Sequence, residues 1–396
     1  MKKLTTILTL VAWSLGAAEN RTNLRPDEQI VFYPTVAQRV PGKTNLWRAQ
    51  IRGCVFEFEK RRLLVATLEE ALELKTAELT ATQSVVFAER ARLFLMDHER
   101  GKKVFIRCGT NEFFVGESSA DGMFGAEVLL REMDLNRAGP EAGAPFTALL
   151  RPGEPRFFSG AVFPLEAEGV SVISDIDDTI KITEVRDKQA TLRNTFLREF
   201  QAVPGMAEFY QLLARNPLTR PSATLSPSDG ERDGVRGRSE NSDAQTSPIA
   251  FHYISASPWQ LYEPLAALVA SNGFPAGTFE LKEFRWKSRK FFSLFASPEK
   301  YKPGVIEPLL KQFPKRKFIL IGDSGERDPE IYGALARKFP TQVIRIYIRD
   351  VTNEAAESER YQKAFRAVPR ATWQIFRDPA ELPPPPPSDS TPHQSR

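Results

Sequence analysis

The chain has 396 residues, of which 41% are hydrophobic and 26% charged, so it can bury a large core, and its length predicts two domains. Lys and Arg number 54 against 50 Asp and Glu, without a basic block, which argues against nucleic acid as a partner. The three histidines, His98, His252 and His393, are far apart, and Cys54 and Cys108 lack zinc-ligand spacing. This excludes a zinc hydrolase and a His-based triad.

The first 18 residues have the pattern of an export signal. Lys2 and Lys3 precede an apolar run over residues 4–15, and small residues follow at 16–18. The run is too short to cross a bilayer comfortably, and the small residues suit a signal peptidase. We therefore expect residues 1–18 to be a cleaved signal peptide and the protein to be exported, to a periplasm or to the extracellular space. An uncleaved membrane anchor or an ordinary helix is the alternative.

Residues 28–137 are predicted to form a small β-sandwich-like domain. Alternating or β-branched and aromatic patterns mark strands, and residues 63–78 interrupt them with a helix-like run. The acids of this region are scattered, so it offers no catalytic constellation. Cys54 and Cys108 both lie on expected strands, and a disulfide and two buried free thiols remain equally open. The expected strands are residues 30–36, 47–58, 91–96, 104–108 and 123–130.

Three segments read as connections or ends. Residues 138–165, rich in Gly, Pro and Ala near their start, predict a linker. Residues 216–248 are polar, with too few aliphatic side chains to offset the entropy of ordering, and predict a disordered surface insertion, with a substrate-gating lid as the alternative. Residues 381–396 predict a Pro-rich disordered tail, whose proline run is expected to be a spacer in polyproline II rather than an SH3 ligand.

Residues 168–380 alternate strands with helices, which predicts a Rossmann-like, doubly wound parallel sheet. Strands are expected near residues 170–175, 249–254, 279–282, 318–321 and 343–348. Ligands of such sheets sit beyond the carboxyl ends of the strands. Asp175, Ser255 and Asp323 all fall at such ends.

The stretch GVSVISDIDDTIKITEV, residues 169–185, carries the strongest chemical signal. Its β-branched run predicts a buried strand that ends in Asp175, and Asp177, Asp178 and Thr179 follow at once. Carboxylates crowded in a poorly solvated crevice repel one another unless a cation or a proton offsets their charge. A divalent metal is the expected solution, and an acidic turn or helix cap is the alternative. Asp178 is expected to be a solvated or supporting acid.

Phosphoryl transfer needs an oxygen nucleophile, a metal, donors for the phosphoryl oxygens and an acid for the leaving group. Asp175, Asp323, Ser255 with a nearby lysine, and Asp177 supply these in order. Four lysines could complete the set, and we favour Lys302 because it begins the helix that leads into the strand of Asp323. The four candidates are Lys287, Lys290, Lys300 and Lys302.

The four elements, in this order and spacing, resemble motifs one to four of the haloacid dehalogenase superfamily of phosphatases. More narrowly, four segments resemble the catalytic domain of the actin-patch-protein type of phosphatidate phosphatase, and the resemblance covers residues 168–378. The insertion at 216–248 and the export signal depart from the fungal pattern. The four segments are SDIDDTIKITEV, YISASPWQLYEPL, KPGVIEPLLKQFPKRKFILIGDSGERDPEIY and IYIRDV.

The resemblance implies a role for each matching residue. Asp175 would be the nucleophile and Asp177 the general acid and base of a magnesium-dependent phosphatase. Phosphate binders would be Thr179, Ser255 and Lys302, and metal ligands would be Asp175, Asp177, Asp323 and Asp328.

The implied substrate is phosphatidate, which gives diacylglycerol, and transient membrane contact would accompany it. Two alternatives stay open at this point. One is an exported phosphatase of broad specificity for small phosphomonoesters, and the other is a secreted binding protein on a catalytically idle scaffold. Assays of phosphate release would separate the three.

Overall fold

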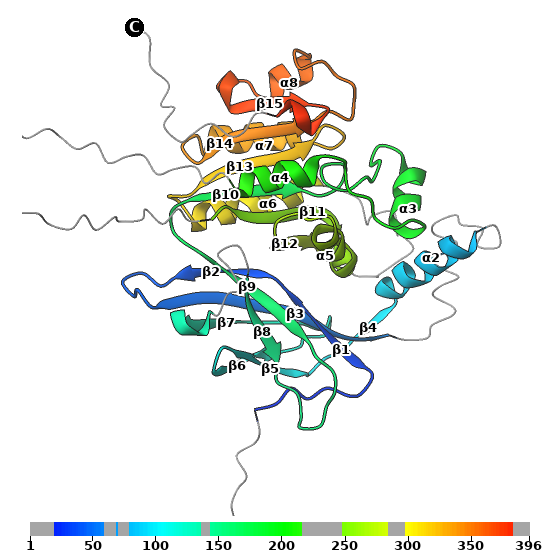
Figure 1. Ribbon diagram of the computed structural model, residues 1–396, viewed down its shortest axis with the longest axis vertical. Coiled ribbons are helices and arrows are strands. Elements are labelled where there is room, and N and C mark those ends of the chain that lie inside the picture. Colours follow the sequence, from blue (N-terminus) through cyan, green and yellow to red (C-terminus); the bar gives the residue numbers. More distant parts are fainter. Residues whose placement is uncertain are drawn as a thin grey trace, which may run out of the picture.

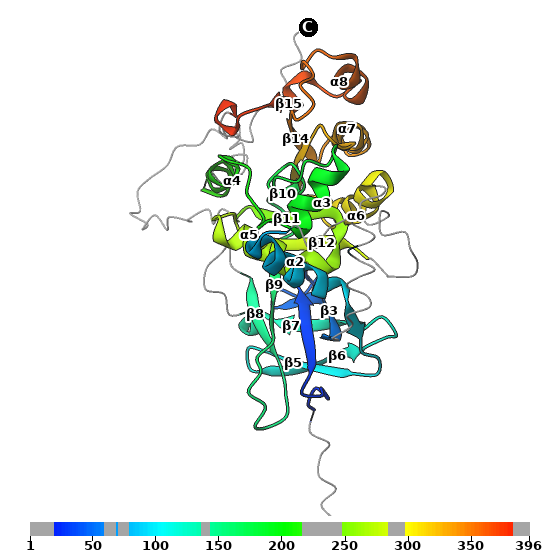
Figure 2. The same cartoon turned by 90° about the vertical axis from the view of Figure 1, so that its right-hand side faces the viewer.

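The computed structural model describes residues 20–58, 69, 79–135, 143–215, 248–283 and 298–382 (Figures 1 and 2). Four predicted segments lie wholly or almost wholly outside these residues, namely the signal peptide, the helix-like run at 63–78, the insertion at 216–248 and the Pro-rich tail. In the described part of the chain, no helix is both long enough and apolar enough to cross a membrane.

The N-terminal part of the described chain forms one curled sheet of nine strands. Its order is β1-β3-β2-β9-β8-β5-β6, and β4 and β7 also pair with the long strand β3. The inward side chains, among them Trp47, Ile51, Val104 and Phe146, form the core of this β-rich module. The sandwich class stays a prediction. The strands are β1 (Glu28–Tyr33), β2 (Thr35–Arg39), β3 (Leu46–Phe58), β4 (Met96–His98), β5 (Lys103–Cys108), β6 (Asn111–Glu117), β7 (Met123–Arg131), β8 (Ala144–Ala148) and β9 (Ser159–Leu165).

Two expectations for this module need correction. The expected linker at 138–165 contains β8 and β9, because Ala144, Phe146 and Val162 face the core although Gly and Pro dominate the local composition. The expected strand at 91–96 is instead the end of helix α2 (Ala81–Phe94) followed by β4. The buried positions of α2 recur at helical spacing, and Thr80 caps its first turn in a capping box.

Cys54 on β3 and Cys108 on β5 are free, buried thiols. Burial raises the pKa of both, that of Cys108 to about 11, so they behave as small apolar side chains at neutral pH. Of the two alternatives, a disulfide and two buried free thiols, the structure has the two free thiols.

The C-terminal part is of the α/β class, as predicted. Six described strands form a fully parallel sheet in the order β12-β11-β10-β13-β14-β15. Chain order reverses at β10, which has β11 on one side and β13 on the other, and ligands bind at such points in open parallel sheets. The strands are β10 (Val170–Asp175), β11 (Ala250–Pro258), β12 (Gly277–Lys282), β13 (Lys317–Asp323), β14 (Val343–Arg349) and β15 (Trp373–Phe376).

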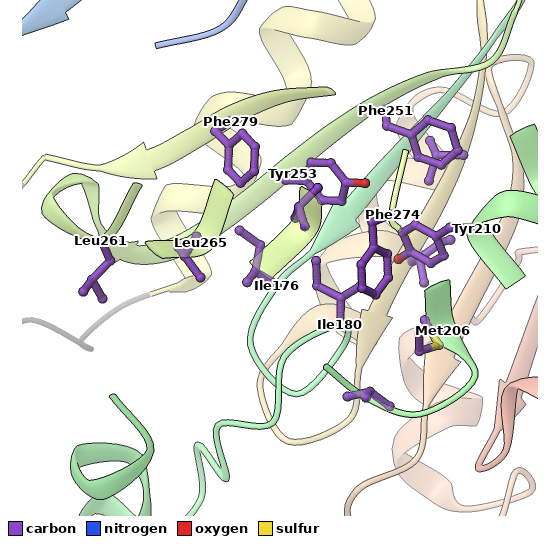
Figure 3. Packing of buried hydrophobic residues seen from close by; sticks show 14 of the residues in the cluster. Ile176, Ile180, Met206, Tyr210, Phe251, Tyr253, Leu261, Leu265, Phe274 and Phe279 are labelled. Carbon is purple, nitrogen blue, oxygen red and sulfur yellow. The ribbon is translucent and has the colours of Figure 1, made fainter. Parts of the chain in front are cut away.

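Successive side chains of the central strands point to opposite faces, so the sheet is apolar on both and helices cover both. On β13, Ile319 and Ile321 pack with α4 and α5, whereas Phe318 and Leu320 pack with α6, α7 and α8. Figure 3 shows the first of these layers, in which the ring of Tyr210 of α4 lies beside those of Phe251 on β11 and Phe274, which follows α5. The helices are α3 (Lys188–Phe196), α4 (Met206–Arg215), α5 (Tyr262–Ser271), α6 (Pro298–Gln312), α7 (Asp328–Lys338) and α8 (Glu359–Ala364).

The two parts of the chain contact each other at several places, and two of these contacts are made by aromatic rings. Trp259, which follows β11, packs in a cluster with side chains of β1 and β3, and its ring lies 6.0 Å from that of Tyr33. Helix α2 packs against α3, where the rings of Phe94 and Phe196 are 5.3 Å apart (Figures 1 and 2). The β-rich module thus reaches the segment that follows Asp175.

His252 is held neutral inside the parallel sheet. Its ring nitrogens lie 2.8 Å from Thr278 Oγ1 and 3.2 Å from Ser171 Oγ, and burial, helped by Arg316, lowers its pKa from 6.5 to about 3. Below pH 6.5 His252 is protonated in the unfolded chain but stays neutral in the folded chain. Stability therefore falls as the pH drops from 6.5 towards 3, by about 1.4 kcal/mol per pH unit.

From pH 7 to pH 5, we expect the free energy of unfolding to fall by about 2 kcal/mol more in the parent than in His252→Gln. Glutamine keeps a polar group that can bond to the two hydroxyls but does not titrate. Urea unfolding of both proteins at the two pH values measures the difference. Equal pH slopes would show that His252 is not the group responsible.

Candidate active site

Asp175 ends the central strand β10 and is 1% exposed. Thr179 Oγ1 donates a hydrogen bond to its Oδ2 at 3.1 Å, and the ammonium of Lys302 lies 2.7 Å from its Oδ1. Pairing of β10 with β11 and β13 on its two sides fixes the backbone of this carboxylate. The predicted position at a strand end is confirmed, and Thr179 contacts the acid that it follows in sequence.

Lys302 projects from the first turns of α6 and is 1% exposed. Its ammonium forms ion pairs with Asp175, with Glu326 at 2.9 Å and with Asp328 at 2.5 Å. Burial by itself lowers the pKa of Lys302, but these three carboxylates outweigh it and hold the pKa well above the usual value. Among the candidate lysines, Lys300 is exposed, and Lys287 and Lys290 lie outside the described residues. Lys302 is therefore the lysine that the described fold brings to Asp175.

Asp175, Asp323 and Asp328 form a cluster of buried carboxylates, each with an oxygen within 4.8 Å of the others. Asp323 Oδ1 accepts from the backbone N–H groups of Gly325 and Glu326, whereas its Oδ2 is buried with no hydrogen-bond partner in the described structure. Burial and neighbouring acids raise the pKa of Asp175 and of Asp323 well above the usual range. An oxygen-only set with an unsatisfied oxygen fits a hard divalent cation such as magnesium.

The carboxylate of Asp177 is not part of this cluster. Its Oδ2 accepts hydrogen bonds from Ser255 Oγ at 2.6 Å and Ser257 Oγ at 2.8 Å. Its Oδ1 accepts from Thr183 Oγ1 at 2.7 Å and pairs with Lys181 Nζ at 3.2 Å. Burial raises the pKa of Asp177, but Lys181 and the hydroxyl donors outweigh it and lower the pKa to about 2. Ser255, predicted to bind phosphate, bonds to Asp177 here.

Asp178 is 6% exposed, so of the two expected roles the structure has the supporting acid and not the solvated one. Its carboxylate accepts from the backbone N–H groups of Thr183, Glu184 and Val185 at 2.7 to 2.8 Å. Its φ of 53° lies in the left-handed region, which Asp tolerates better than most residues. Asp178 therefore ties the loop after β10 into a closed turn.

Sequence reasoning missed several residues that contact the predicted ones. Lys181 and Thr183 lie in the same run as Asp177, and Glu326 lies between Asp323 and Asp328 in the third segment, so their nearness in sequence was a usable signal. Ser257 had none beyond its place two residues after Ser255. It is the parallel pairing of β10 and β11 that brings Ser257 to Asp177.

Taken together, the fold and the site define an α/β domain with a buried acidic cluster, an ion-paired lysine and a hydrogen-bonded aspartate at one edge of a parallel sheet. Such a combination suits binding of a divalent cation together with an anionic group.

The comparisons with known proteins agree with this class. Residues 170–350 match the family model described as the catalytic domain of phosphatidate phosphatase APP1. Phosphatidate phosphatase APP1 of Saccharomyces cerevisiae is 34% identical over 193 residues, which are 48% of this chain and 27% of the yeast protein. An uncharacterized protein of Schizosaccharomyces pombe is 26% identical over 194 residues, which are 48% of this chain and 26% of that protein.

Residues 170–350 thus resemble the catalytic domain of APP1, and the predicted resemblance is confirmed for this part of the chain. The match begins at β10 and ends just after β14, so it includes Asp175, Asp177, Ser255, Lys302 and Asp323. The chain spans about a quarter of the length of these two curated relatives.

Proposed function

We propose that this domain is a magnesium-dependent phosphomonoesterase whose favoured substrate is phosphatidate, which it hydrolyses to diacylglycerol and phosphate. The observation that carries the proposal is the buried Asp175 carboxylate at the end of β10, held between Lys302 and Thr179 beside two further acids. The named activity of the yeast relative supports phosphatidate as the substrate.

We assign the domain to the haloacid dehalogenase-like class of doubly wound folds. Numbered along the chain, its parallel strands run in the order 3-2-1-4-5-6, with the acidic loop leaving strand 1, and this order supports the assignment. Export through residues 1–18 stays a prediction of the sequence.

In the proposed reaction, a carboxylate oxygen of Asp175 attacks phosphorus in line. The bond to the lipid alkoxide breaks, Asp177 gives the alkoxide a proton, and the phosphoryl group is left on Asp175. Asp177 then takes a proton from the water that attacks phosphorus, and the phosphate leaves with regeneration of the Asp175 carboxylate.

Magnesium, held by Asp175, Asp323, Asp328 and the carbonyl oxygen of Asp177, would offset the charge of the phosphate. Lys302 is placed to neutralise the developing charge on the phosphoryl oxygens, since its ammonium already contacts the attacking carboxylate.

The four donors around Asp177 explain how one residue can serve in both steps. A pKa of about 2 makes Asp177 a carboxylate at neutral pH, which is the form that the second step requires, although a weakly basic one. For the first step Asp177 has to carry a proton. If Ser255 turns from Asp177 to a phosphoryl oxygen, the carboxylate loses a donor at 2.6 Å and its pKa rises. Substrate binding would thereby favour the acid form.

Phosphate release from phosphatidate in mixed micelles, compared with a panel of small phosphomonoesters, tests the proposal. We expect turnover of phosphatidate that EDTA abolishes and added magnesium restores, because the acid cluster repels phosphate without a cation. Equal or faster turnover of the small esters would favour a broad phosphomonoesterase instead. No release from any substrate, with the folded protein and magnesium present, would favour a binding protein.

A further inference from the structure

The ring of Phe200 contacts two cations from distant parts of the chain. Arg90 Cζ, on helix α2, lies 4.2 Å from the ring centroid, and Lys181 Nζ lies 4.7 Å from it. Arg90 is 8% exposed and Lys181 is 2% exposed. The attraction of a ring face for a cation is strongest where water is excluded, so both contacts carry weight.

Lys181, one of the two cations on the ring of Phe200, contacts one carboxylate oxygen of Asp177. Its ammonium pairs with Asp177 Oδ1 and donates to Thr183 Oγ1 at 2.6 Å, and Thr183 Oγ1 in turn donates to the same Oδ1. The other oxygen belongs to the two serines near the end of β11. Lys181 and Thr183 therefore hold one of the two carboxylate oxygens and help to set the rotation of the Asp177 side chain.

The backbone explains why Phe200 reaches Lys181. Ile182 N donates to Gln201 O at 2.8 Å, and Val203 N donates to Ile180 O at 2.9 Å, so the segment after Asp177 pairs with the segment after Phe200. Lys181 itself forms a bridge with Ala202. The position of the ring is thus fixed by pairing within the α/β part of the chain.

Arg90, the other cation, has the ring of Phe200 as its main partner. The ion pair described for it joins Glu199 at 3.5 Å, but Glu199 is 71% exposed, and such pairs contribute little. Arg90 Nε has no hydrogen-bond partner in the described structure. The cation is buried where α2 packs on the segment that contains α3, so among the described residues the ring of Phe200 is its main buried partner.

We propose that helix α2, which the chain inserts between β3 and β4, positions the acid and base of the active site through Arg90, Phe200 and Lys181. Arg90 and Phe200 are positioning residues, because they act on Asp177 through Lys181, and Lys181 contacts the Asp177 carboxylate itself. The inference rests on the proposed function for its effect on turnover. It assigns a part in catalysis to this inserted helix, whose packing on α3 keeps Asp177 correctly oriented.

Kinetics distinguish positioning from mere packing. We expect Phe200→Leu to lower kcat about tenfold with little change in KM, because a misoriented Asp177 slows proton transfer without weakening phosphate binding. Phe200→Tyr, which keeps the ring, should restore most of the rate. Arg90→Met should lower kcat about threefold, the range of a partly desolvated cation–ring contact. The matched control is Arg92→Met, since Arg92 lies exposed on the same helix over Phe58 and should leave kcat unchanged.

Reductive methylation of lysines in the folded full-length protein, read by peptide mass spectrometry, tests the same contacts without substrate. Lys181 should be protected in the parent and should react at least several-fold faster in Phe200→Leu and in Arg90→Met. Lys302 is the internal reference, because it is equally buried but held by other carboxylates.

Faster labelling of Lys181 alone, together with the loss of kcat, would support the proposal. Parallel labelling of Lys181 and Lys302, which means general loosening, would overturn it, and so would unchanged labelling in both variants. If the parent hydrolyses no phosphoester, the proposed function fails, and the labelling result still decides whether α2 holds Lys181.

Discussion

Asp175→Asn should abolish phosphate release, with a fall in kcat of about 10⁴ or more, while the domain remains folded. An amide is a poor nucleophile, so no phosphoryl group should become attached to the protein. The substitution is nearly isosteric, and Lys302 keeps its pairs with Glu326 and Asp328. It also removes a buried carboxylate whose charge burial disfavours, so metal-free stability should not fall. Intact-mass analysis after rapid quenching, beside a phosphate assay, measures both effects.

Asp177→Asn should fail in a different way. With a substrate whose leaving group needs no proton, such as p-nitrophenyl phosphate, the phosphoenzyme should still form slowly and then persist, because no base activates the water. Asp187→Asn is the matched control, since Asp187 caps α3 from an exposed position and asparagine caps helices equally well. Full magnesium-dependent activity in Asp175→Asn would rule out the proposed mechanism.

Lys302→Met should have the largest combined effect on stability and activity. In metal-free buffer at neutral pH, we expect the free energy of unfolding to fall by about 3 to 5 kcal/mol, because removing one partner leaves buried carboxylates without their cation. We also expect kcat with magnesium to fall by about 10² to 10³, the usual loss when a positioned donor at the reacting group is removed. Urea unfolding in EDTA and phosphate release in magnesium measure the two.

Lys300→Met provides the control for Lys302→Met. Lys300 is exposed on the same helix two residues away, so its replacement should change neither quantity appreciably. Magnesium should return part of the stability lost in Lys302→Met, because a divalent cation can take over the neutralisation of the acids. Parental stability and turnover in Lys302→Met would show that its three ion pairs matter for neither.

The sequence predicted the parallel sheet and the acids at its carboxyl edge because both follow from local patterns of residue types. A β-branched run ending in Asp175 and another ending in Asp323 each predict a buried strand with an acid at its carboxyl end. Parallel strands place those ends at one edge of a sheet, so the two acids had to be near each other. The strands of the β-rich module were harder to predict from the sequence. Its short strands β8 and β9 have Gly and Pro around them, and the alternation of β8 spans only Ala144–Ala148.

By itself, then, the sequence predicted which residues would carry the proposed chemistry, namely Asp175, Asp177, Asp323 and the favoured Lys302, because their types and spacing can be read from the chain alone. The tertiary structure determined which side chains contact one another. It joined Ser255 to Asp177, buried Asp178 under three backbone N–H groups, and brought Arg90 of α2 to Phe200. These contacts depend on side-chain direction and on packing between segments up to 110 residues apart (200 minus 90), which no local period encodes.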